Sequence, residues 1–374
     1  MHDVLISGGG PAGAVAALVL ARAGARVLVL DRSRFPRHKL CGDTLNPGAL
    51  AVLHRLGIAE VAAAGLPLRG MVVTGEPAVS VEGHYGGELC GRALQRSVLD
   101  AALIAAAEQA GARIEQEVLV REPLIAGGRV AGLIVAARDG RSTAIRAALT
   151  IAADGASSRI ARALRLGRHP QRPRRWAVGA YYEGVTGLRD LGEMHVRHDR
   201  YIGVAPLPGS LANACVVTAD RKALRESAAL VDRTVRTDPL LAERFRRAQR
   251  VTAPVSLGPL AVECATCGMP GLLLAGDAAG FIDPMTGDGL RFALRGAELA
   301  AAEALSALEH GHSDAHLRLS AARRREFARK WRFNRALRAL VSSPAAVRAA
   351  AHGAVWAPRW LQHVIRYAGD LRAA

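Results

Sequence analysis

The sequence is poor in lysine and in aromatic residues, and both shortages bear on its high positive charge. Only three of its 50 basic residues are lysines, so the formal net charge of +17 over 374 residues is carried almost entirely by arginine. Aromatic residues make up 4% of the chain, which is too few for the stacking platform that single-stranded nucleic acid requires. We therefore attribute much of the charge to composition and expect no nucleic-acid partner.

Cysteine and long apolar runs are also scarce. Five cysteines are too few for a disulfide framework, and their odd number leaves at least one free thiol. Cys264 and Cys267 form a lone C-x-x-C pair without the second pair of a structural zinc site, so we expect no metal there. No run of about 18 uncharged apolar residues occurs, and Asp3 falls where a signal peptide would be basic. These absences predict a cytoplasmic protein without a membrane span.

What the sequence does contain is a β-turn-α-β pattern at its start. Residues 3–7 and 26–30 are continuous apolar strands, and residues 14–23 between them are helical. Such strands around a helix are typical of a parallel sheet covered on both faces. Helices are also predicted over residues 94–110 and 289–309.

The rest of the chain divides by character. Strand-like runs such as Trp176–Tyr182 and Ala214–Thr218, mixed with prolines, predict a second, mixed sheet. The fold class is therefore α/β, with three predicted parts: a discontinuous nucleotide-binding domain (1–70, 90–165 and 260–310), a substrate domain (71–89 and 166–259) and a C-terminal helical segment (311–374).

The glycines of the first turn fit the pattern G-x-G-x-x-G. Gly8 permits the tight turn, Gly10 lets backbone approach a pyrophosphate, and Gly13 allows the helix to pack closely on the strand. The helix N-terminus then favours the negative charge of the pyrophosphate. Asp31, at the end of the second strand, can accept a hydrogen bond from a ribose hydroxyl and disfavours a 2′-phosphate. The turn therefore predicts FAD or NAD rather than NADP.

Two later segments favour FAD. Asp277 follows a buried strand and can bind a polyol hydroxyl, and a bare turn with Pro284, Gly287 and Gly289 leads into a helix at Leu290. FAD has a ribityl chain and an isoalloxazine ring that would use both features, whereas NAD has neither of these two groups. A third segment, Asp154–Gly155, again ends a strand with an acid and a glycine.

With these segments the chain resembles the FAD-dependent para-hydroxybenzoate hydroxylase superfamily, and most closely its geranylgeranyl-reductase branch. The branch-level similarity rests on F-P-R-H-K-L-C-G-D at 35–43 and on G-D-A-A-G-F-I-D-P at 276–284. The resemblance implies a Rossmann-type FAD-binding domain interleaved with a mixed-sheet substrate domain. It assigns cofactor contacts to Gly8, Gly10, Pro11, Ala12, Gly13, Asp31, Arg32, Cys41, Gly42, Arg96, Asp154, Gly155, Gly276, Asp277, Pro284, Gly287, Asp288, Gly289 and Leu290.

The same resemblance places a substrate cavity at Tyr201 to Pro206. This stretch keeps the tyrosine and proline of the Tyr-x-Trp-x-Phe-Pro motif of the reductases but lacks its tryptophan, which argues against a prenyl substrate. Flavin-dependent halogenases need an active-site lysine and a Trp-x-Trp-x-x-Pro segment. We expect none of the three lysines to be suitably placed, and so no halogenation.

Because flavin performs the redox step itself, the sequence can indicate the enzyme class without a catalytic side chain. Our leading hypothesis is an oxidoreductase that reduces a carbon–carbon double bond of a hydrophobic or carrier-bound substrate, with NAD(P)H or another donor supplying electrons. The alternatives are a monooxygenase acting on an aromatic or peptidyl substrate, and a non-catalytic flavoprotein that serves as a maturation or binding factor. Cys41 is a candidate proton donor, and His38 and Lys39 could contact cofactor phosphate.

The C-terminal segment concentrates arginine at helical spacings over residues 323–338. Such a face could dock on anionic lipid at the inner face of the membrane, or receive an acidic carrier protein or peptide. It could also be an ordinary solvated helix face, and the sequence leaves the three possibilities open.

Overall fold

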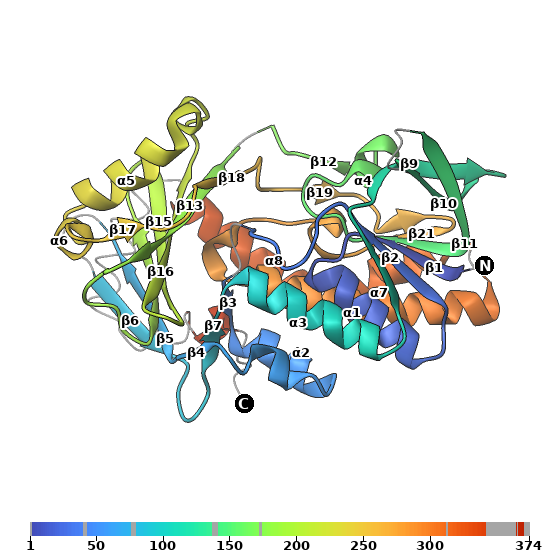
Figure 1. Cartoon of the computed structure of the whole chain (residues 1–374), viewed down its shortest axis with the longest axis horizontal. Coiled ribbons are helices and arrows are strands. Elements are labelled where there is room, and N and C mark those ends of the chain that lie inside the picture. Colours follow the sequence, from blue (N-terminus) through green and yellow to red (C-terminus); the bar gives the residue numbers. More distant parts are fainter. Residues whose placement is uncertain are drawn as a thin grey trace.

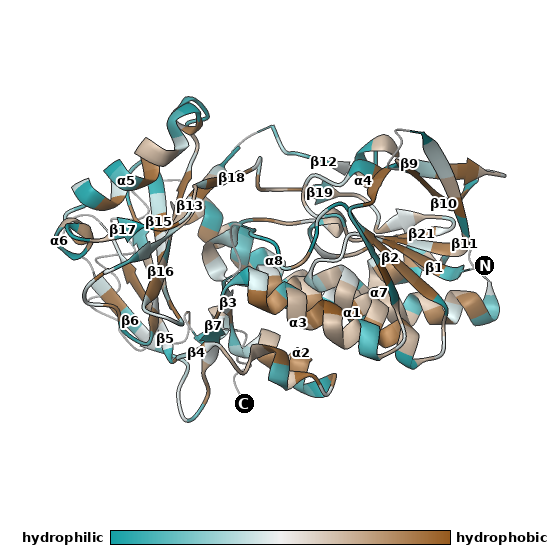
Figure 2. Cartoon of the chain, viewed as in Figure 1, coloured by the Kyte–Doolittle hydropathy of each residue, from teal (hydrophilic) through white to brown (hydrophobic). Residues whose placement is uncertain are grey.

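Two large sheets lie at opposite ends of the molecule, and the chain crosses between them several times (Figure 1). The computed structural model describes residues 2–39, 43–75, 80–136, 141–171, 174–311, 313–341, 364 and 366–369. The central strands of the first sheet are the most apolar segments in that part of the molecule (Figure 2). The fold is α/β, as the sequence predicts.

The first sheet is built from the continuous apolar runs. Its main strands, in spatial order, are β20 (Gly268–Met269), β21 (Leu272–Leu274), β11 (Ser142–Ala152), β1 (His2–Ser7), β2 (Val27–Asp31) and β8 (Arg113–Gln116). All neighbours are parallel except β20 and β21. Ser7 lies in register with Ala152, which lies in register with Leu274. The loops that follow these strands therefore meet at one edge of the sheet.

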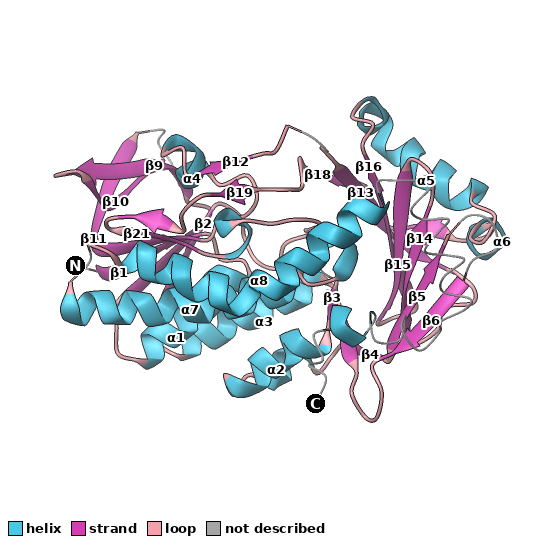
Figure 3. Ribbon diagram, turned by 180° about the vertical axis from the view of Figure 1, so that it is seen from behind, coloured by secondary structure: helices cyan, strands magenta, loops and turns pink. Residues whose placement is uncertain are grey.

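Helices and a hairpin cover this sheet. The helices are α1 (Pro11–Arg22), α3 (Arg96–Gln109), α7 (Gly289–His310) and α8 (Ala315–Val341), which lie side by side in Figure 3. Alanines such as Ala297, Ala300 and Ala304 are fully buried, and such small side chains let α7 approach α1 closely. The antiparallel hairpin of β9 (Leu119–Ala126) and β10 (Arg129–Ala136) continues from β11, and α4 (Arg159–Ala163) packs against β9.

The second sheet is mainly antiparallel. Its strands, in spatial order, are β17 (Gln249–Arg250), β13 (Trp176–Glu183), β16 (Leu211–Thr218), β15 (Arg200–Leu207), β14 (Leu191–Val196), β5 (Gly70–Thr74) and β6 (Ser80–His84), with β18 (Val255–Leu257) paired to β13. The β14–β5 pair is parallel. One face packs on α5 (Ser227–Thr237) and α6 (Ala242–Phe245) through residues such as Tyr182 and Phe245. The other face turns toward the first unit.

Short elements join the two sheets. They are the sheet β3 (Thr44–Leu45), β7 (Gly91–Ala93) and β4 (Leu66–Leu68), the pair β12 (Gly167–Arg168) and β19 (Glu263–Cys264), helix α2 (Pro47–Arg55), and the 3-10 turns η1 (Ala59–Ala62), η2 (Lys222–Glu226), η3 (Gly276–Ala279) and η4 (Pro284–Thr286). No helix that the structure describes is both long and apolar enough to cross a membrane.

The helices predicted over 94–110 and 289–309 are confirmed as α3 and α7. The helix predicted over 14–23 begins earlier, at Pro11, because proline fits the first helical position, where its missing N–H costs nothing. Strands predicted over Trp176–Tyr182 and Ala214–Thr218 lie within β13 and β16. The division of the chain at the proposed domain boundaries stays a prediction.

Candidate cofactor and active site

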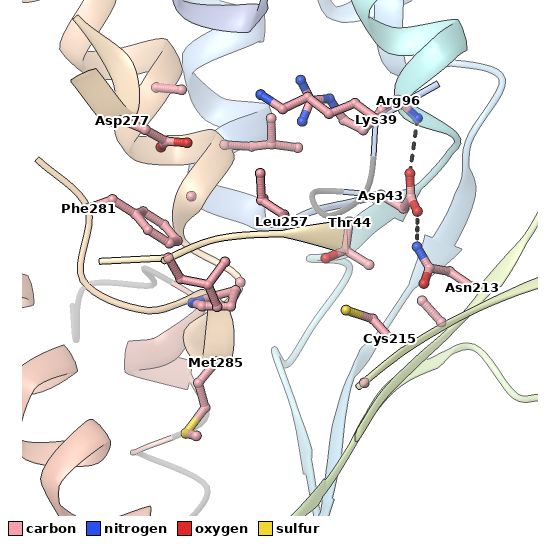
Figure 4. Close-up of a pocket in the computed structure, with 18 of the residues that line it drawn as sticks. Lys39, Asp43, Thr44, Arg96, Asn213, Cys215, Leu257, Asp277, Phe281 and Met285 are labelled. Atoms are coloured by element: carbon pink, nitrogen blue, oxygen red, sulfur yellow. Dashed lines mark hydrogen bonds between the residues drawn. The ribbon is translucent and has the colours of Figure 1, made fainter. Parts of the chain in front are cut away.

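A cavity lies between the two sheets, where loops of the first sheet face β14, β15 and β16 of the second (Figure 4). One wall consists of segments that the sequence assigns to the cofactor. The opposite wall is largely apolar and comes from the second sheet and the segment after β18.

The β1–α1 turn brings backbone to this cavity. Gly8 has φ of +99°, and a Cβ there would lie 2.6 Å from the carbonyl oxygen of Ala153. A Cβ on Gly13 would lie 1.8 Å from the carbonyl oxygen of Gly8, so this helix can approach its strand only with glycine. Gly10, Pro11 and Ala12 line the cavity, and the helix has no side-chain cap. The first-turn N–H groups are therefore available to an anion.

Asp31 shapes this turn from the end of β2. Its carboxylate accepts backbone hydrogen bonds from Gly9 and Ser33, both at 2.7 Å, and lies 3.9 Å from the guanidinium of Arg37. A carboxylate held in this way keeps lone pairs for a ribose hydroxyl. Arg32, which the resemblance also assigned to the cofactor, is exposed and is not among the residues that line the cavity.

The two residues of the Asp154–Gly155 segment have different roles. Gly155 lines the cavity, with φ of +83°. Asp154 does not line it, and its carboxylate accepts a hydrogen bond from the backbone N–H of Arg159 at 2.9 Å. Burial raises the pKa of Asp154, and its hydrogen bond to Ser158 partly opposes this. Asp154 thus orders the start of α4 and acts on the cavity only through its neighbour.

The segment from Gly276 to Leu290 supplies the third part of the cofactor wall. Eight of its residues line the cavity: Gly276, Asp277, Phe281, Pro284, Met285, Gly287, Gly289 and Leu290. A Cβ on Gly276 would lie 2.8 Å from the Cβ of Ala12, so this segment presses directly on the start of α1. Helix α7 begins here without a side-chain cap, which gives the cavity a second helix N-terminus.

Asp288 points away from the cavity. Its carboxylate is 1% exposed and accepts hydrogen bonds from Asn46 and Asn334, each at 3.1 Å, while the ammonium of Lys330 lies 3.3 Å away. Burial raises its pKa, and Lys330 works against that rise. Instead of lining the cavity, Asp288 links α2, α7 and α8 through these contacts.

Arg96 lines the cavity in a network whose centre is a residue without a role in the sequence analysis, Asp43. The guanidinium of Arg96 donates to both carboxylate oxygens of Asp100, at 2.8 and 2.9 Å. Asp43 accepts from the backbone N–H of Arg96 at 3.0 Å, from Tyr181 Oη at 3.2 Å and from Asn213 Nδ2 (Figure 4). Burial raises the pKa of the Asp43 carboxyl, and the hydrogen bond from Asn213 partly opposes this rise. Asp43 therefore joins the start of α3 to the second sheet.

Tyr201 lies in the substrate-side wall. Its hydroxyl donates to Asp283 Oδ1 at 2.6 Å, and Arg175 donates to the other oxygen of the same carboxylate at 2.9 Å. Asp283 also accepts from the backbone N–H of Met285, so this cluster fixes the turn at Pro284. Pro206 is buried but is not among the residues that line the cavity.

Lys39, which the sequence analysis offered as a possible contact to cofactor phosphate, lines the cavity. It lies on the cofactor side, because its ammonium would be 3.9 Å from a Cβ on Gly155. Burial lowers the pKa of Lys39, and the nearby Arg96 lowers it further. His38 is exposed, and Cys41 and Gly42 lie outside the described residues.

The C-x-x-C pair serves the same region structurally. Cys264 and Cys267 are free thiols, and Cys264 Sγ lies 3.1 Å from the carbonyl oxygen of Ala278, next to the Asp277 turn. Burial raises the pKa of Cys264 to about 11. Within the described ranges, no group of three or more potential metal ligands occurs.

This geometry suits a dinucleotide with a flavin ring. Two helix N-termini without side-chain caps open onto one cavity, and Asp277 lines the same cavity. Glycines occupy the positions where a Cβ would collide with neighbouring atoms. An anion and a polar ring edge are the groups that such helix ends favour. The fold and the site thus define an FAD-binding protein of the two-sheet type.

Comparison with known proteins agrees. A family described as "FAD binding domain" matches residues 1–332. The chain is 32% identical to the menaquinone reductase of Mycobacterium tuberculosis, over 80% of this chain and 75% of that protein. It is 31% identical to digeranylgeranylglycerophospholipid reductase 1 of Methanopyrus kandleri, over 84% of this chain and 83% of that protein.

Solved structures show the same fold. A geranylgeranyl bacteriochlorophyll reductase-like protein of Thermoplasma acidophilum superposes with a TM-score of 0.79 at 24% identity, covering 91% of this chain and 87% of that one. A triple mutant of the flavin-dependent brominase Bmp2 superposes with a TM-score of 0.86 at 20% identity, covering 99% and 94%. The chain belongs to the FAD-binding domain family, and FAD is its cofactor. It is an FAD-dependent oxidoreductase, as the sequence predicts.

Proposed function

We propose that this protein reduces a carbon–carbon double bond in a hydrophobic substrate. The observation that carries the proposal is its similarity, over most of the chain, to reductases named for menaquinone and for a digeranylgeranyl phospholipid, both of which bear isoprenoid chains. The substrate-side wall supports it, because its side chains are mostly apolar: Met71, Met194, Val204, Val217, Leu257, Leu260, Phe281 and Met285. Such a wall favours an apolar ligand and excludes water.

The residues of this chain have distinct tasks in that reaction. The α1 N-terminus binds the pyrophosphate, and Asp277 binds a hydroxyl of the ribityl chain. When bound, FAD supplies the hydride that the reduction needs. The cluster of Tyr201, Asp283 and Arg175 holds the Pro284 turn in place, so the apolar wall keeps a fixed position relative to the cofactor. Cys41 stays a candidate proton donor.

Gly203 bears on the width of the substrate. It lines the cavity at the position where the reductase motif has tryptophan, and a Cβ there would meet no heavy atom closer than 4.0 Å. The cavity therefore has room beside Tyr201 that a tryptophan would fill. We propose a substrate that is bulkier at this point than a single prenyl chain. We further propose NAD(P)H or another carrier as the electron donor and a site of action on the cytoplasmic side of the membrane.

The test uses purified FAD-loaded protein whose flavin has been reduced without oxygen. Detergent-dispersed menaquinone and a geranylgeranyl lipid are added separately, and flavin reoxidation is followed at ~450 nm, a property of the cofactor. We expect one of them to reoxidise the flavin and to gain two hydrogen atoms by mass spectrometry. In a parallel reaction under air, product that gains oxygen, with matching oxygen consumption, would establish a monooxygenase instead. If neither substrate reoxidises the flavin, the proposal fails for both, and the alternative of a flavoprotein that only binds gains support.

A pair of variants tests the cavity. Gly203→Trp should abolish turnover of the bulkier substrate while FAD stays bound, because the indole fills the space beside Tyr201. Gly203→Ala is the matched control and should turn over normally, since its Cβ has room. Equal activity of both variants would refute this position for the substrate.

A further inference from the structure

Helix α8 has one exposed face made largely of arginine. Its exposed basic residues are Arg324, Arg325, Arg329, Arg332 and Arg335. From Arg325 onward they recur at spacings of four and three, and Arg324 lies beside Arg325, so all five share one side of the helix. Ala328, Ala336 and Ala339 are exposed on the same side. From Arg324 to Arg335 this arginine face extends over about 16 Å at the rise of an α-helix. Leu317, 53% exposed, lies on the same side seven residues before Arg324.

The opposite face of α8 is buried and has its own basic residues. Arg323 and Lys330 are 1% and 3% exposed, and the same side carries the fully buried Phe327. Arg323 donates to the carbonyl oxygen of Ala279, and Lys330 pairs with Asp288. Arg323 and Lys330 thus form an inner group that holds the fold, and the exposed arginines form an outer group without ion-pair partners among the described residues.

The arginine face has no counter-charge within the part of the chain that the structure describes. The only acidic residue of α8 is Glu326, and it forms ion pairs with Arg291 at 3.2 Å and Arg295 at 3.3 Å, both on α7. None of the five outer arginines has a hydrogen bond or ion pair with a described residue. Five like charges side by side repel one another, so an external anionic surface would stabilise them.

The helix also lies close to the cavity. It runs from the first sheet toward the second along the outer side of α7 (Figure 3). Near its end, Leu337 packs in the apolar cluster that contains Tyr201 and Met285, and Arg338 Nε lies 4.0 Å from Asp283. A surface bound along the arginine face would therefore lie against the element that supports the substrate-side wall.

We propose that the arginine face of α8 docks the protein on an anionic lipid bilayer. A bilayer fits better than an acidic protein, because protein interfaces have an apolar or aromatic centre and this face offers arginine and alanine. Phe327 is buried and Trp331 and Phe333 are half-buried, so α8 has no exposed aromatic side chain among its described residues. The choice of lipid rests on the proposed hydrophobic substrate, which a bilayer would hold. Each arginine near an anionic surface should strengthen binding about fivefold.

The experiment is sedimentation of the FAD-loaded full chain with vesicles. We expect binding to equimolar phosphatidylglycerol and phosphatidylcholine, no binding to phosphatidylcholine alone, and release between ~0.05 and ~0.5 M NaCl as the charges are screened. The variant Arg325→Gln/Arg329→Gln/Arg332→Gln should bind about 100-fold more weakly, since three contributions are lost.

The matched control removes the same charge elsewhere. Arg221→Gln/Arg225→Gln/Arg233→Gln alters exposed arginines on and beside η2 and α5 and should bind vesicles like the unaltered chain. Equal binding by both triple variants, no binding by the unaltered chain, or tighter binding to poly-glutamate than to vesicles would overturn the proposal. Turnover of detergent-dispersed substrate is measured in parallel. Loss of vesicle binding with normal turnover would contradict the docking proposal alone. Vesicle binding without turnover would contradict the reductase proposal alone.

Discussion

Single residues in the cofactor wall are constrained mainly by how closely backbone segments approach one another. Gly8 and Gly13 have no room for a side chain, whereas Asp31 is held by two backbone N–H groups. These constraints follow from a short stretch of sequence, so the sequence predicted them. Asp43 and Asp288 are different, because their partners are distant: Asn213 for the first, and Asn46 and Asn334 for the second. No local pattern indicates such partners.

At the residue scale we predict that Gly13→Ala prevents normal FAD binding. The added Cβ would lie 1.8 Å from the Gly8 carbonyl oxygen, and relieving the overlap would cost about 3 kcal/mol or more. Flavin content after purification and the free energy of unfolding in urea measure this. Gly24→Ala, just beyond the other end of α1, is the control: its Cβ has open space, and its φ of +84° costs only about 1 kcal/mol. Full flavin content in Gly13→Ala would refute this role.

Among the elements, β14 carries a buried charge network that joins it to α6. Glu193 and His195 are two residues apart and so share one face of the strand, and Glu193 also lines the cavity together with Gly192 and Met194. Arg244 on α6 binds both oxygens of Glu193 at 2.7 Å, and His195 lies 3.0 Å from the same carboxylate. Burial acts to raise the pKa of Glu193, but the hydrogen bonds from Arg244 and His195 together lower it below 4.5. The ion pair between Arg244 and Glu193 therefore holds α6 against the second sheet.

We predict that Arg244→Gln lowers the free energy of unfolding by about 3 kcal/mol at pH 7, because it leaves a buried carboxylate without its cation. The pKa of Glu193 is lower in the folded protein than its unfolded value of about 4.5, so the ionised carboxylate stabilises the fold above that pH. This stabilisation is lost as the pH falls through the pKa of the folded state. The difference from the unaltered chain should therefore narrow below pH ~4.5 in urea titrations. Arg246→Gln, in an exposed pair with Glu243, should cost less than about 1 kcal/mol at any pH. A gap that persists in acid would contradict the ion-pair explanation.

The whole molecule is organised around the cavity between its two units. Asp43 joins a loop of the first unit to Tyr181 and Asn213 of the second, and Asp283 does the same with Tyr201. A ligand that binds the first unit therefore meets a wall whose position depends on the second. Helix α8 spans both and adds the arginine face.

At this scale we predict that FAD stabilises both units together. Free FAD at 100 times its dissociation constant should raise the free energy of unfolding by about 2.7 kcal/mol. Hydrogen exchange should slow in β1 of the first sheet and in β16 of the second. FMN lacks the AMP half of FAD, and with it the complete pyrophosphate that the α1 N-terminus would bind, so it should give much less protection. Protection limited to the first sheet would show that the two units are not coupled through the cavity.

The sequence by itself determined the parallel sheet, the glycine turn and the Asp277 segment, and thereby the cofactor. These features depend on residues close together in the chain, where spacing and backbone sterics leave few choices. Only the tertiary structure decided which of several similar residues serve the site. It placed Lys39 in the cavity and Asp288 outside it. It also divided the basic residues of α8 into a buried group and an exposed group. Burial and charge pairing depend on segments that meet only after folding, so composition could not distinguish them.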